Sequence, residues 1–271
     1  MQLPPDIAAS GYRLITRDAT DSTNSDAAAA ARRGDPGGLW VVAREQRTGR
    51  GRHGRSWSSP PGNLYASLLL INPCEAALAP QLGFVAGLAL HEAVATETGL
   101  EAPRLGLKWP NDLLLDGAKV AGVLLEGHHG PESFGVVIGF GVNVVAAPDG
   151  VPYPARALRE ITSDVSPEAV FASLARAFVR HLTAWREARQ RKDEEPFESV
   201  RAQWLARAAG QGSAVTIRLP TGDRTGTFRG VDRAGRLQLE TAGGMELIDA
   251  GDLYFPHLHS AGPRSGASVS G

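Results

Sequence analysis

The sequence predicts an α+β protein in two parts, a larger one that combines strands with long helices and a smaller one built of short strands. Two observations carry this prediction. Apolar residues recur at helical spacing over residues 80–98 and 167–190, among several strand-like runs. From about Gly210 the pattern changes to short alternating runs separated by PTGD, RAG and AGG, which is typical of a small β-barrel. We expect domains at 1–209 and 210–258, and a disordered polar tail at 259–271.

The elements of the larger domain are predicted from their boundary residues. A first helix follows the cap candidates of DSTN and ends before Gly34. Strands are expected at GLWVVA, NLYASLLLI and SFGVVIGFGVNVV. Asp116-Gly117 is a hairpin signal between two β-prone runs, and Ser166 caps the last long helix, with Pro167 at its first position.

Composition limits the function. The chain has 271 residues, of which 42% are hydrophobic, so it can form a substantial core. Its 28 basic and 29 acidic side chains give a net charge of −1, which is not typical of a polyanion binder. The N-terminus lacks the pattern of a signal peptide, and no apolar run reaches the roughly 18 residues of a membrane span. With Cys74 as its single cysteine, the chain is expected to be cytoplasmic, with no membrane partner and no internal disulfide.

An arginine-rich segment, REQRTGRGRHGRSW, occupies residues 44–57. Its glycines allow successive backbone N–H groups to point at one set of ligand oxygens, and Arg50, Arg52 and Arg55 can fork onto phosphate or carboxylate. Trp57, directly after the loop, can stack on a purine. By itself the pattern fits a solvated basic loop, a nucleic-acid contact or a phosphate site about equally well.

The motif LKWPND places a cation at the end of a strand. Pro110 favours an extended Trp109, so Lys108 is the last side chain of the strand, in an apolar setting where a cation needs an anionic partner. It fits either a structural ion pair or an anion site. Asn111 and Asp112 fit either a ligand site or an ordinary turn.

Each of two further motifs fits either a structural role or a role in ligand binding. In GFGVNV, Gly139 and Gly141 indicate close approach by a ligand or another backbone, and Asn143 lies on the same face of the strand as Gly141. Its amide would suit an adenine edge or an ordinary buried hydrogen bond. In DSTN, Ser22 and Thr23 either cap the first helix or bind a ligand. The sequence has no Cys/His set at metal-ligand spacing and no P-loop.

Taken in order, DSTN, Q..TGRGRHGRSW, KWPND, AKVAGVLLE and IGFGVNV resemble the motifs of the biotin protein ligases, over about residues 12–258. The resemblance implies a class II synthetase-like catalytic domain, a mixed sheet flanked by helices, followed by a small SH3-like β-barrel. It also implies the reaction. Biotin and ATP form biotinyl-5′-AMP and pyrophosphate, and a lysine of a biotin carboxyl carrier protein or domain, such as that of acetyl-CoA carboxylase, then displaces AMP. Mg²⁺ would be carried mainly by the ATP phosphates, with Asn111 or Asp112 as a protein ligand.

The resemblance implies a role for each matching residue. The biotin site would comprise Ser22, Thr23, Asn24, Gln46, Gly49, Arg50, Lys108, Gly122, Gly139 and Gly141. The site for ATP and the adenylate would comprise Arg50, Arg52, Arg55, Trp57, Lys108, Asn111 and Asn143. Lys108, Arg52 and Arg55 would be catalytic. The resemblance does not define roles for Asp112 and Lys119, nor which group deprotonates the acceptor lysine.

Departures from the family pattern refine the expectation. Bifunctional relatives carry a DNA-binding helix–turn–helix before the catalytic domain, whereas DSTN begins here at Asp21, so we expect a ligase without repressor function and without a DNA partner. The resemblance is compatible with a homodimer. The final strand, GDLYFPHL, lacks the arginine that some relatives present to the nucleotide. Either His257 takes the place of that arginine or no residue does. We also expect the loop at 44–57 to be mobile without ligand and ordered with biotin plus ATP.

Two alternatives compete with this interpretation. Lipoate ligases share the fold and the acyl-adenylate chemistry, but they typically lack GRGRxGRxW and KWPND. A regulator that binds nucleic acid or senses a small ligand is the non-catalytic alternative, and the net charge of −1 disfavours its nucleic-acid form.

Overall fold

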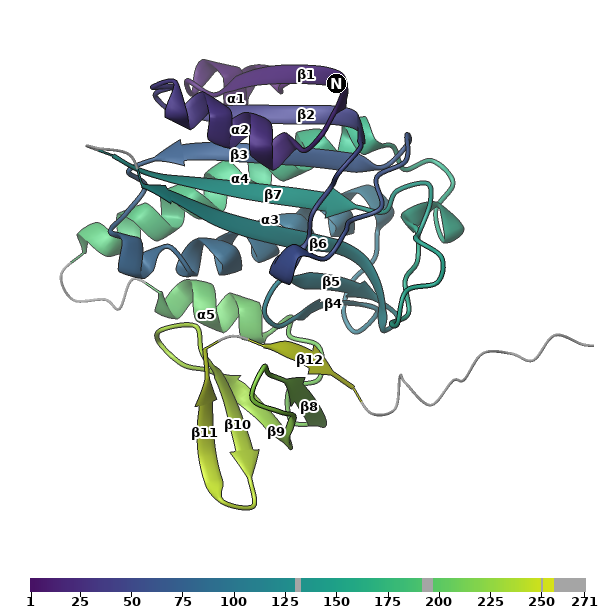
Figure 1. Cartoon of the computed structure of the whole chain (residues 1–271), viewed down its shortest axis with the longest axis vertical. Helices are drawn as coiled ribbons and strands as arrows, with labels where there is room; N and C mark the ends of the chain where they lie inside the picture. The colour runs from purple at the N-terminus through teal and green to yellow at the C-terminus, as the bar shows by residue number, and fades with distance from the viewer. Residues whose placement is uncertain (130–132, 192–196, 250, 256–271) are drawn as a thin grey trace, which may run out of the picture.

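The computed structural model describes residues 1–129, 133–191, 197–249 and 251–255. These residues form a seven-stranded sheet in the order β1-β2-β3-β7-β6-β5-β4 and a five-stranded sheet in the order β11-β10-β9-β8-β12 (Figure 1). The predicted class, a mixed sheet flanked by helices and followed by a small antiparallel β-domain, is confirmed. The boundary near residue 209 stays a prediction. His257 and the tail at 259–271 lie outside the described residues.

The elements have the following bounds in chain order: α1 Pro5–Ala9, β1 Arg13–Thr20, α2 Thr23–Arg32, β2 Leu39–Gln46, β3 Leu64–Ile71, α3 Gln81–Thr98, β4 Leu105–Lys108, β5 Asp112–Leu115, β6 Ala118–His129, β7 Phe134–Val142, α4 Pro167–Gln190, α5 Glu198–Leu205, β8 Ala214–Arg218, β9 Arg224–Val231, β10 Leu237–Thr241, β11 Gly244–Ile248 and β12 Asp252–Tyr254. Short 3₁₀ turns lie at Arg52–Gly54, Ala76–Leu78 and Leu158–Glu160.

The first unit is a strand, a helix and a parallel strand. β1 pairs in parallel with β2, and α2 makes the crossover between them, so the N-terminus of α2 follows the carboxyl end of β1. Ser22 occupies the N-cap position but makes no side-chain capping hydrogen bond. The helix therefore begins where predicted, and the polar side chains of DSTN are available for other contacts.

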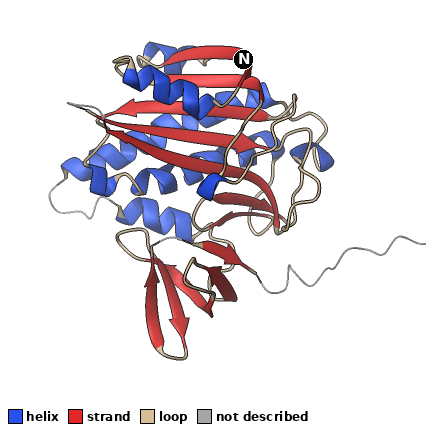
Figure 2. Ribbon diagram, viewed as in Figure 1, coloured by secondary structure: helices blue, strands red, loops and turns tan. Residues whose placement is uncertain are grey.

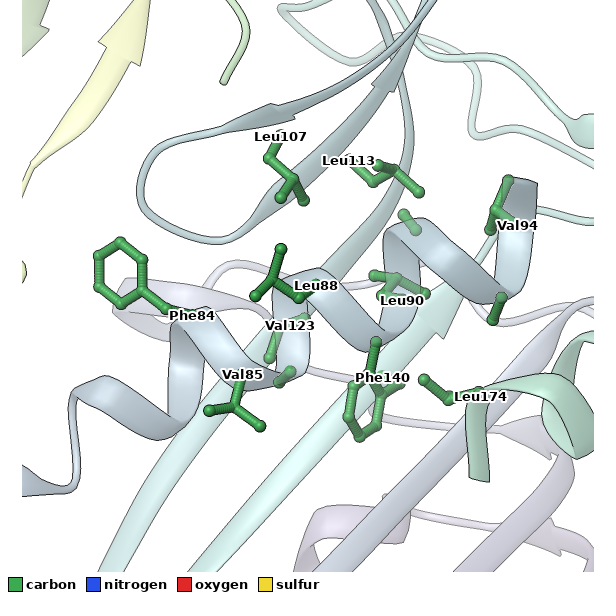
Figure 3. Close-up of a cluster of buried hydrophobic side chains, with 14 of the residues drawn as sticks. Phe84, Val85, Leu88, Leu90, Val94, Leu107, Leu113, Val123, Phe140 and Leu174 are labelled. Atoms are coloured by element: carbon green, nitrogen blue, oxygen red, sulfur yellow. The ribbon is translucent and has the colours of Figure 1, made fainter. Parts of the chain in front are cut away.

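Helices cover both faces of the large sheet (Figure 2). Leu39 and Val41 of β2 pack with the alanines of α2 on one face, while Trp40 points to the opposite face and meets Phe171 of α4 edge-on. On that opposite face, α3 directs a row of apolar side chains toward β4, β5, β6, β7 and α4 (Figure 3). The row and its neighbours are Phe84, Val85, Leu88, Leu90, Val94, Leu107, Leu113, Val123, Phe140 and Leu174.

The hairpin between β5 and β6 turns at the predicted residues and carries a bulge. Asp116 and Gly117 adopt positive φ angles of 48° and 81°, as a tight two-residue turn requires. Leu114 of β5 pairs with Lys119 of β6, and the next residue of β5, Leu113, pairs with Ala121. Val120 is therefore the extra residue of the bulge. A bulge re-aims the side chains beside it, and here it directs Lys119 over Gly122 toward β5.

The segment that leads into the small domain pairs with β4 at the edge of the large sheet, and the turn between β9 and β10 contacts Trp109. Leu107 N donates to Arg207 O at 2.8 Å, and Ala209 N donates to Leu107 O at 2.8 Å. Trp109 is buried and its Nε1 donates to Gly235 O at 3.2 Å, in the turn between β9 and β10. This docking places β12 beside the end of β4, next to Lys108 (Figure 1).

Candidate active site

A cleft of about 1150 Å³ lies over β5, β6 and β7, between the N-terminus of α2, the arginine-rich loop and β12. The predicted residues that line it are Ser22, Thr23, Asn24, Gln46, Arg50, Arg52, Arg55, Trp57, Lys108, Asn111, Asp112, Lys119, Gly122, Gly139 and Gly141. Gly49 and Asn143 are the predicted residues that do not line it. The fold therefore gathers residues of five sequence motifs into one cleft.

One end of the cleft is a network of uncharged side chains, which we call the neutral end and define as Thr23, Asn24, Gln46, Ser59 and Ser67. Gln46 Oε1 accepts hydrogen bonds from the backbone N of Thr23 at 2.9 Å and from its Oγ1 at 3.0 Å. Gln46 Nε2 donates to Ser59 Oγ at 3.1 Å. Ser67 Oγ lies 2.7 Å from Thr23 Oγ1 and 2.6 Å from Asn24 Oδ1. The amide of Gln46 thus has a single orientation.

The neutral end has more acceptor oxygens than hydroxyl protons. Asn24 Nδ2 donates to Glu126 Oε2 at 2.6 Å, so the oxygen of this amide faces Ser67 and accepts its only hydroxyl proton. The single hydroxyl proton of Thr23 then serves either Gln46 Oε1 or Ser67 Oγ. One close oxygen pair lacks a proton, so this end suits a neutral ligand that brings N–H donors.

The three predicted strand glycines make room for protein side chains that line the cleft. A Cβ on Gly139 would lie 2.2 Å from Asn24 Oδ1, and a Cβ on Gly141 would lie 2.6 Å from Trp57 Cε2. A Cβ on Gly122 would lie 3.3 Å from Lys119 Cε. Gly49 acts similarly behind the cleft, since its Cβ would lie 2.6 Å from Ser59 Oγ and 2.9 Å from Gln46 Nε2. Direct contact of these glycines with a ligand stays a prediction.

The other end of the cleft, the charged end, comprises Arg52, Arg55, Lys108, Asp112, Lys119 and Asp252. Asp112 begins β5 and pairs with two lysines, since Lys119 Nζ lies 2.7 Å from Oδ1 and Lys108 Nζ lies 3.7 Å from Oδ2. Burial alone raises the pKa of Asp112, but the charges of Lys119 and Lys108 outweigh it and hold that pKa below its ordinary value. Lys108 is therefore ion-paired and also lines the cleft, and its role in an anion site stays a prediction.

Two arginines of the loop bind to the small domain. Arg52 Nη1 donates to Gly251 O at 3.0 Å, and Arg55 Nη2 donates to Asp252 Oδ1 at 2.9 Å. The loop itself is a small hairpin, in which Gly51 N donates to Arg55 O at 2.7 Å. The predicted phosphate-binding arginines thus join the two domains across the cleft. Arg50 points to the other side and lies 3.7 Å from Glu126 Oε1.

Trp57 and Asn143 meet beside the main cleft. They line a neighbouring cavity of about 620 Å³ together with Lys119 and Tyr153. The Trp57 ring covers Gly141, and its buried Nε1 has no hydrogen-bond partner among the described residues. Asn143 is 2% exposed and its Nδ2 donates to Arg156 O at 3.3 Å, which is an ordinary buried hydrogen bond, and adenine binding by Asn143 stays a prediction.

The cleft does not form a dedicated metal cage. Within the described ranges no cluster of three or more His, Cys, Asp or Glu side chains lies close enough together to hold a metal ion. Asp112 is already neutralised by two lysines, and Asn111 Nδ2 donates to Val123 O at 2.6 Å. A metal ion at this place would therefore compete with two lysines for the carboxylate of Asp112.

Several lining or supporting residues were missed by the sequence reasoning. Ser67 had a local signal, because it is the single serine within the apolar run LYASLLLI and is fully buried. Glu126 ends the motif AKVAGVLLE but was given no role, and it contacts Asn24 rather than lining the cleft. Tyr153 and Asp252 had no local signal, because each reaches the cleft from a segment outside the motifs.

The fold is a mixed sheet flanked by helices and followed by a small antiparallel domain, and cations gather at one end of its cleft. Residues 19–143 match the Biotin/lipoate A/B protein ligase family, and residues 211–255 match the Biotin protein ligase C terminal domain. The chain is 43% identical to a biotin–[acetyl-CoA-carboxylase] ligase of Paracoccus denitrificans, over 87% of this chain and 98% of that protein. The chain belongs to the biotin protein ligase family.

Other relatives agree with this assignment. A biotin–[acetyl-CoA-carboxylase] ligase of Mycobacterium tuberculosis is 35% identical, over 91% of this chain and 90% of that protein. The solved structure of biotin protein ligase from Aquifex aeolicus in complex with biotin and ATP has a TM-score of 0.75 at 30% identity, and covers 89% of this chain and 97% of its own. In the part of the chain that the structure describes, no helix is long and apolar enough to cross a membrane.

Proposed function

We propose that the protein activates biotin with ATP to give biotinyl-5′-AMP and transfers the biotinyl group to a lysine of a carboxyl carrier protein. The observation that carries this proposal is the division of one cleft into a neutral, hydrogen-bonding end and a charged end. Biotin has the same division, with a neutral ureido ring at one end and a carboxylate at the other.

The neutral end suits the ureido ring. Its acceptor oxygens at Thr23 and Gln46, both of which line the cleft, match ring N–H donors, and Ser22 lies beside them at the start of α2. Burying these polar groups under a ligand costs free energy unless the ligand forms hydrogen bonds with them. A ring with complementary N–H donors is therefore favoured over one without them.

The charged end suits the activation step. The biotin carboxylate oxygen attacks the α-phosphorus of ATP, the new O–P bond forms, and the bond to pyrophosphate breaks. Both reactants are anions, and two unit charges 4 Å apart repel by about 4 kcal/mol at an effective dielectric constant of about 20. We assign Lys108 to the space between the carboxylate and the α-phosphate, and Arg52 and Arg55 to the phosphate oxygens, where charge increases during the reaction.

The nucleobase is assigned to the neighbouring cavity. Trp57 offers an aromatic face there, and Tyr153 offers a second ring. The buried Nε1 of Trp57 is a hydrogen-bond donor, and an acceptor atom of the nucleobase would satisfy it. Asn143 also lines this cavity, where its Nδ2 donates to Arg156 O, and its Oδ1 remains a candidate contact for the nucleobase.

Magnesium is expected to enter with ATP. The ion would neutralise part of the phosphate charge, and the paired state of Asp112 leaves Asn111 as the more suitable protein ligand of the two. A cytoplasmic location, a homodimeric state and the lack of a DNA partner also remain proposals. In the described part of the chain, only the five-residue helix α1 precedes β1.

The test is pyrophosphate exchange into ATP, measured with biotin, with lipoate and with neither acid. We expect exchange with biotin alone. Exchange with lipoate alone would overturn the substrate assignment. The absence of exchange with either acid would overturn the proposal that the protein is an adenylate-forming enzyme. The match of residues 211–255 to the biotin-specific C-terminal domain favours biotin over lipoate.

A further inference from the structure

Glu126 is a carboxylate in contact with the neutral end of the cleft. It lies on β6, two residues after Leu124 and four after Gly122, both of which line the cleft. Because alternate residues of a strand share one face, Glu126 points to the cleft side of the sheet. Its partner on β7 is Val137, which packs with the alanines of α2 on that same side. Glu126 is therefore a charged side chain beside the first turn of α2.

The two oxygens of Glu126 have unequal partners. Oε2 accepts a hydrogen bond from Asn24 Nδ2 at 2.6 Å, whereas Oε1 lies 3.7 Å from Arg50 Nη2. The side chains of Glu126 and Arg50 are 31% and 41% exposed, and an ion pair so open to water contributes little. Asn24 is 5% exposed, and its short bond to the carboxylate is charge-assisted. The amide of Asn24 is therefore the main partner of Glu126.

This contact fixes the direction of the Asn24 amide. An ionised carboxylate only accepts hydrogen bonds, so the NH₂ group of Asn24 must face Glu126 and its Oδ1 must face Ser67. Ser67 is fully buried, and its single hydroxyl proton is drawn to Oδ1 at 2.6 Å. No proton of Ser67 then remains for Thr23 Oγ1, which lies 2.7 Å away. The shortage of protons at the neutral end therefore begins at Glu126.

A neutral amide in place of this carboxylate would remove the constraint. The amide of Asn24 could then turn over and donate to Ser67, and the proton of Ser67 would pass to Thr23 Oγ1. The proton of Thr23 would serve Gln46 Oε1. Every close pair of oxygens would then have its own proton, and an N–H group of a ligand would no longer be needed to fill the gap.

We propose that Glu126 is a positioning residue for the biotin ring, which acts by fixing the direction of the Asn24 amide. The neutral end thereby stays short of protons and selects a ring that brings N–H donors. The dithiolane ring of lipoate has no such donor. The inference rests on the proposed function, and Glu126 acts through Asn24 rather than by contact with the ring.

The first experiment compares wild type and Glu126→Gln in biotin-dependent pyrophosphate exchange. We expect the KM for biotin to rise about tenfold, as the loss of one hydrogen bond to the ligand implies, while kcat and the KM for ATP stay close to their wild-type values. Glu240→Gln is the matched control, because it removes a carboxylate that Arg229 Nε contacts at 2.8 Å within the small domain, away from the cleft. A wild-type KM for biotin in folded Glu126→Gln would overturn the inference.

The second experiment restores the arrangement by exchanging the two groups. The double variant Asn24→Asp with Glu126→Gln puts the carboxylate at position 24, where it again accepts from Ser67, and the amide at position 126, where it donates. We expect the double variant to recover most of the biotin affinity that Glu126→Gln loses. An equal loss in both would show that the direction of the amide is not what Glu126 provides, and the inference would fail.

The double variant also decides the matter if Glu126→Gln does not fold. A KM for biotin near the wild-type value is then expected, and a rise of about tenfold would contradict the inference. The two levels of the proposal remain separable. No exchange by the wild type would overturn the proposed function, whereas normal exchange by the wild type with unchanged biotin kinetics in Glu126→Gln would overturn the role of Glu126 alone.

Discussion

The neutral end and the charged end of the cleft are built on different principles. At the neutral end the partners of Thr23, Gln46 and Ser67 all belong to the large domain, and Thr23 and Ser67 are 3% and 0% exposed. At the charged end, Arg52 and Arg55 bond to Gly251 and Asp252, at the start of β12 and almost two hundred residues away in the chain. One end is a permanent part of the large domain, and the other depends on how two domains meet.

The difference follows from the cost of burying each kind of group. An unsatisfied buried hydroxyl or amide costs about 1–3 kcal/mol, so the neutral end is hydrogen-bonded within the fold. A buried charge costs more, so each cation has a carboxylate partner that a substrate anion can replace. The neutral end thus provides shape and orientation, while the charged end provides exchangeable electrostatic contacts.

Replacement of Lys108 tests the charged end most severely. We expect Lys108→Ala to lower biotin-dependent pyrophosphate exchange by about 100-fold to 1000-fold, because it removes a cation placed where charge develops. Asp112 keeps Lys119 as a partner, so the fold should persist. ATP binding, measured by calorimetry, should change much less. Exchange at the wild-type rate would remove Lys108 from the site.

Loss of a single hydroxyl tests the neutral end. Thr23→Val removes the group that contacts Gln46 Oε1 and Ser67 Oγ, and we expect biotin affinity to fall by about 1–3 kcal/mol while ATP affinity is retained. Calorimetric titration with each substrate measures both. Thr98→Val is the matched control, because its hydroxyl bonds Val94 O at the end of α3. A loss of ATP affinity with normal biotin affinity would reverse the assignment of the two ends.

A methyl group added at Gly141 of β7 tests the position of Trp57 between the neutral end and the charged end of the cleft. Gly141→Ala would place a Cβ 2.6 Å from Trp57 Cε2 and displace the indole ring, so we expect the KM for ATP to rise by about tenfold, as loss of one base-stacking contact implies. The control is Gly83→Ala, whose Cβ would lie 3.8 Å from Leu125 Cδ1, away from the cleft. Normal ATP kinetics in Gly141→Ala would show that Trp57 is not a wall of the base site.

The contact between the domains is expected to give the smallest effect. Asp252→Asn removes the carboxylate that Arg55 binds, and a half-exposed pair of this kind contributes roughly 0.2–1 kcal/mol. We expect faster proteolysis within residues 44–57, and protection when biotin and ATP are added together. Asp223→Asn, which affects a pair with Arg218 inside the small domain, is the control. Proteolysis that biotin and ATP leave unchanged would count against a loop that orders around its ligands.

Local patterns predicted most of the fold. The bounds of α2, α3 and α4 follow from their caps and apolar spacing, and the turn at Asp116-Gly117 follows from its residue types. β1 was not predicted, because it is an edge strand with several exposed polar residues and lacks a clear alternation. α5 was not predicted either, since its short sequence follows a charged stretch and is helical through packing on α3 and β9.

The sequence by itself determined the chemical groups of the site, because motif residues such as Gln46, Lys108 and Trp57 are recognisable by type and spacing. Only the tertiary structure decided their partners. It showed that Gly139 and Gly141 accommodate side chains of the protein, and that Asp252 and Asp112 neutralise the cations. The physical reason is that a hydrogen bond or ion pair depends on which segments become neighbours on folding. That arrangement is set by long-range packing rather than by the residues adjacent in the chain.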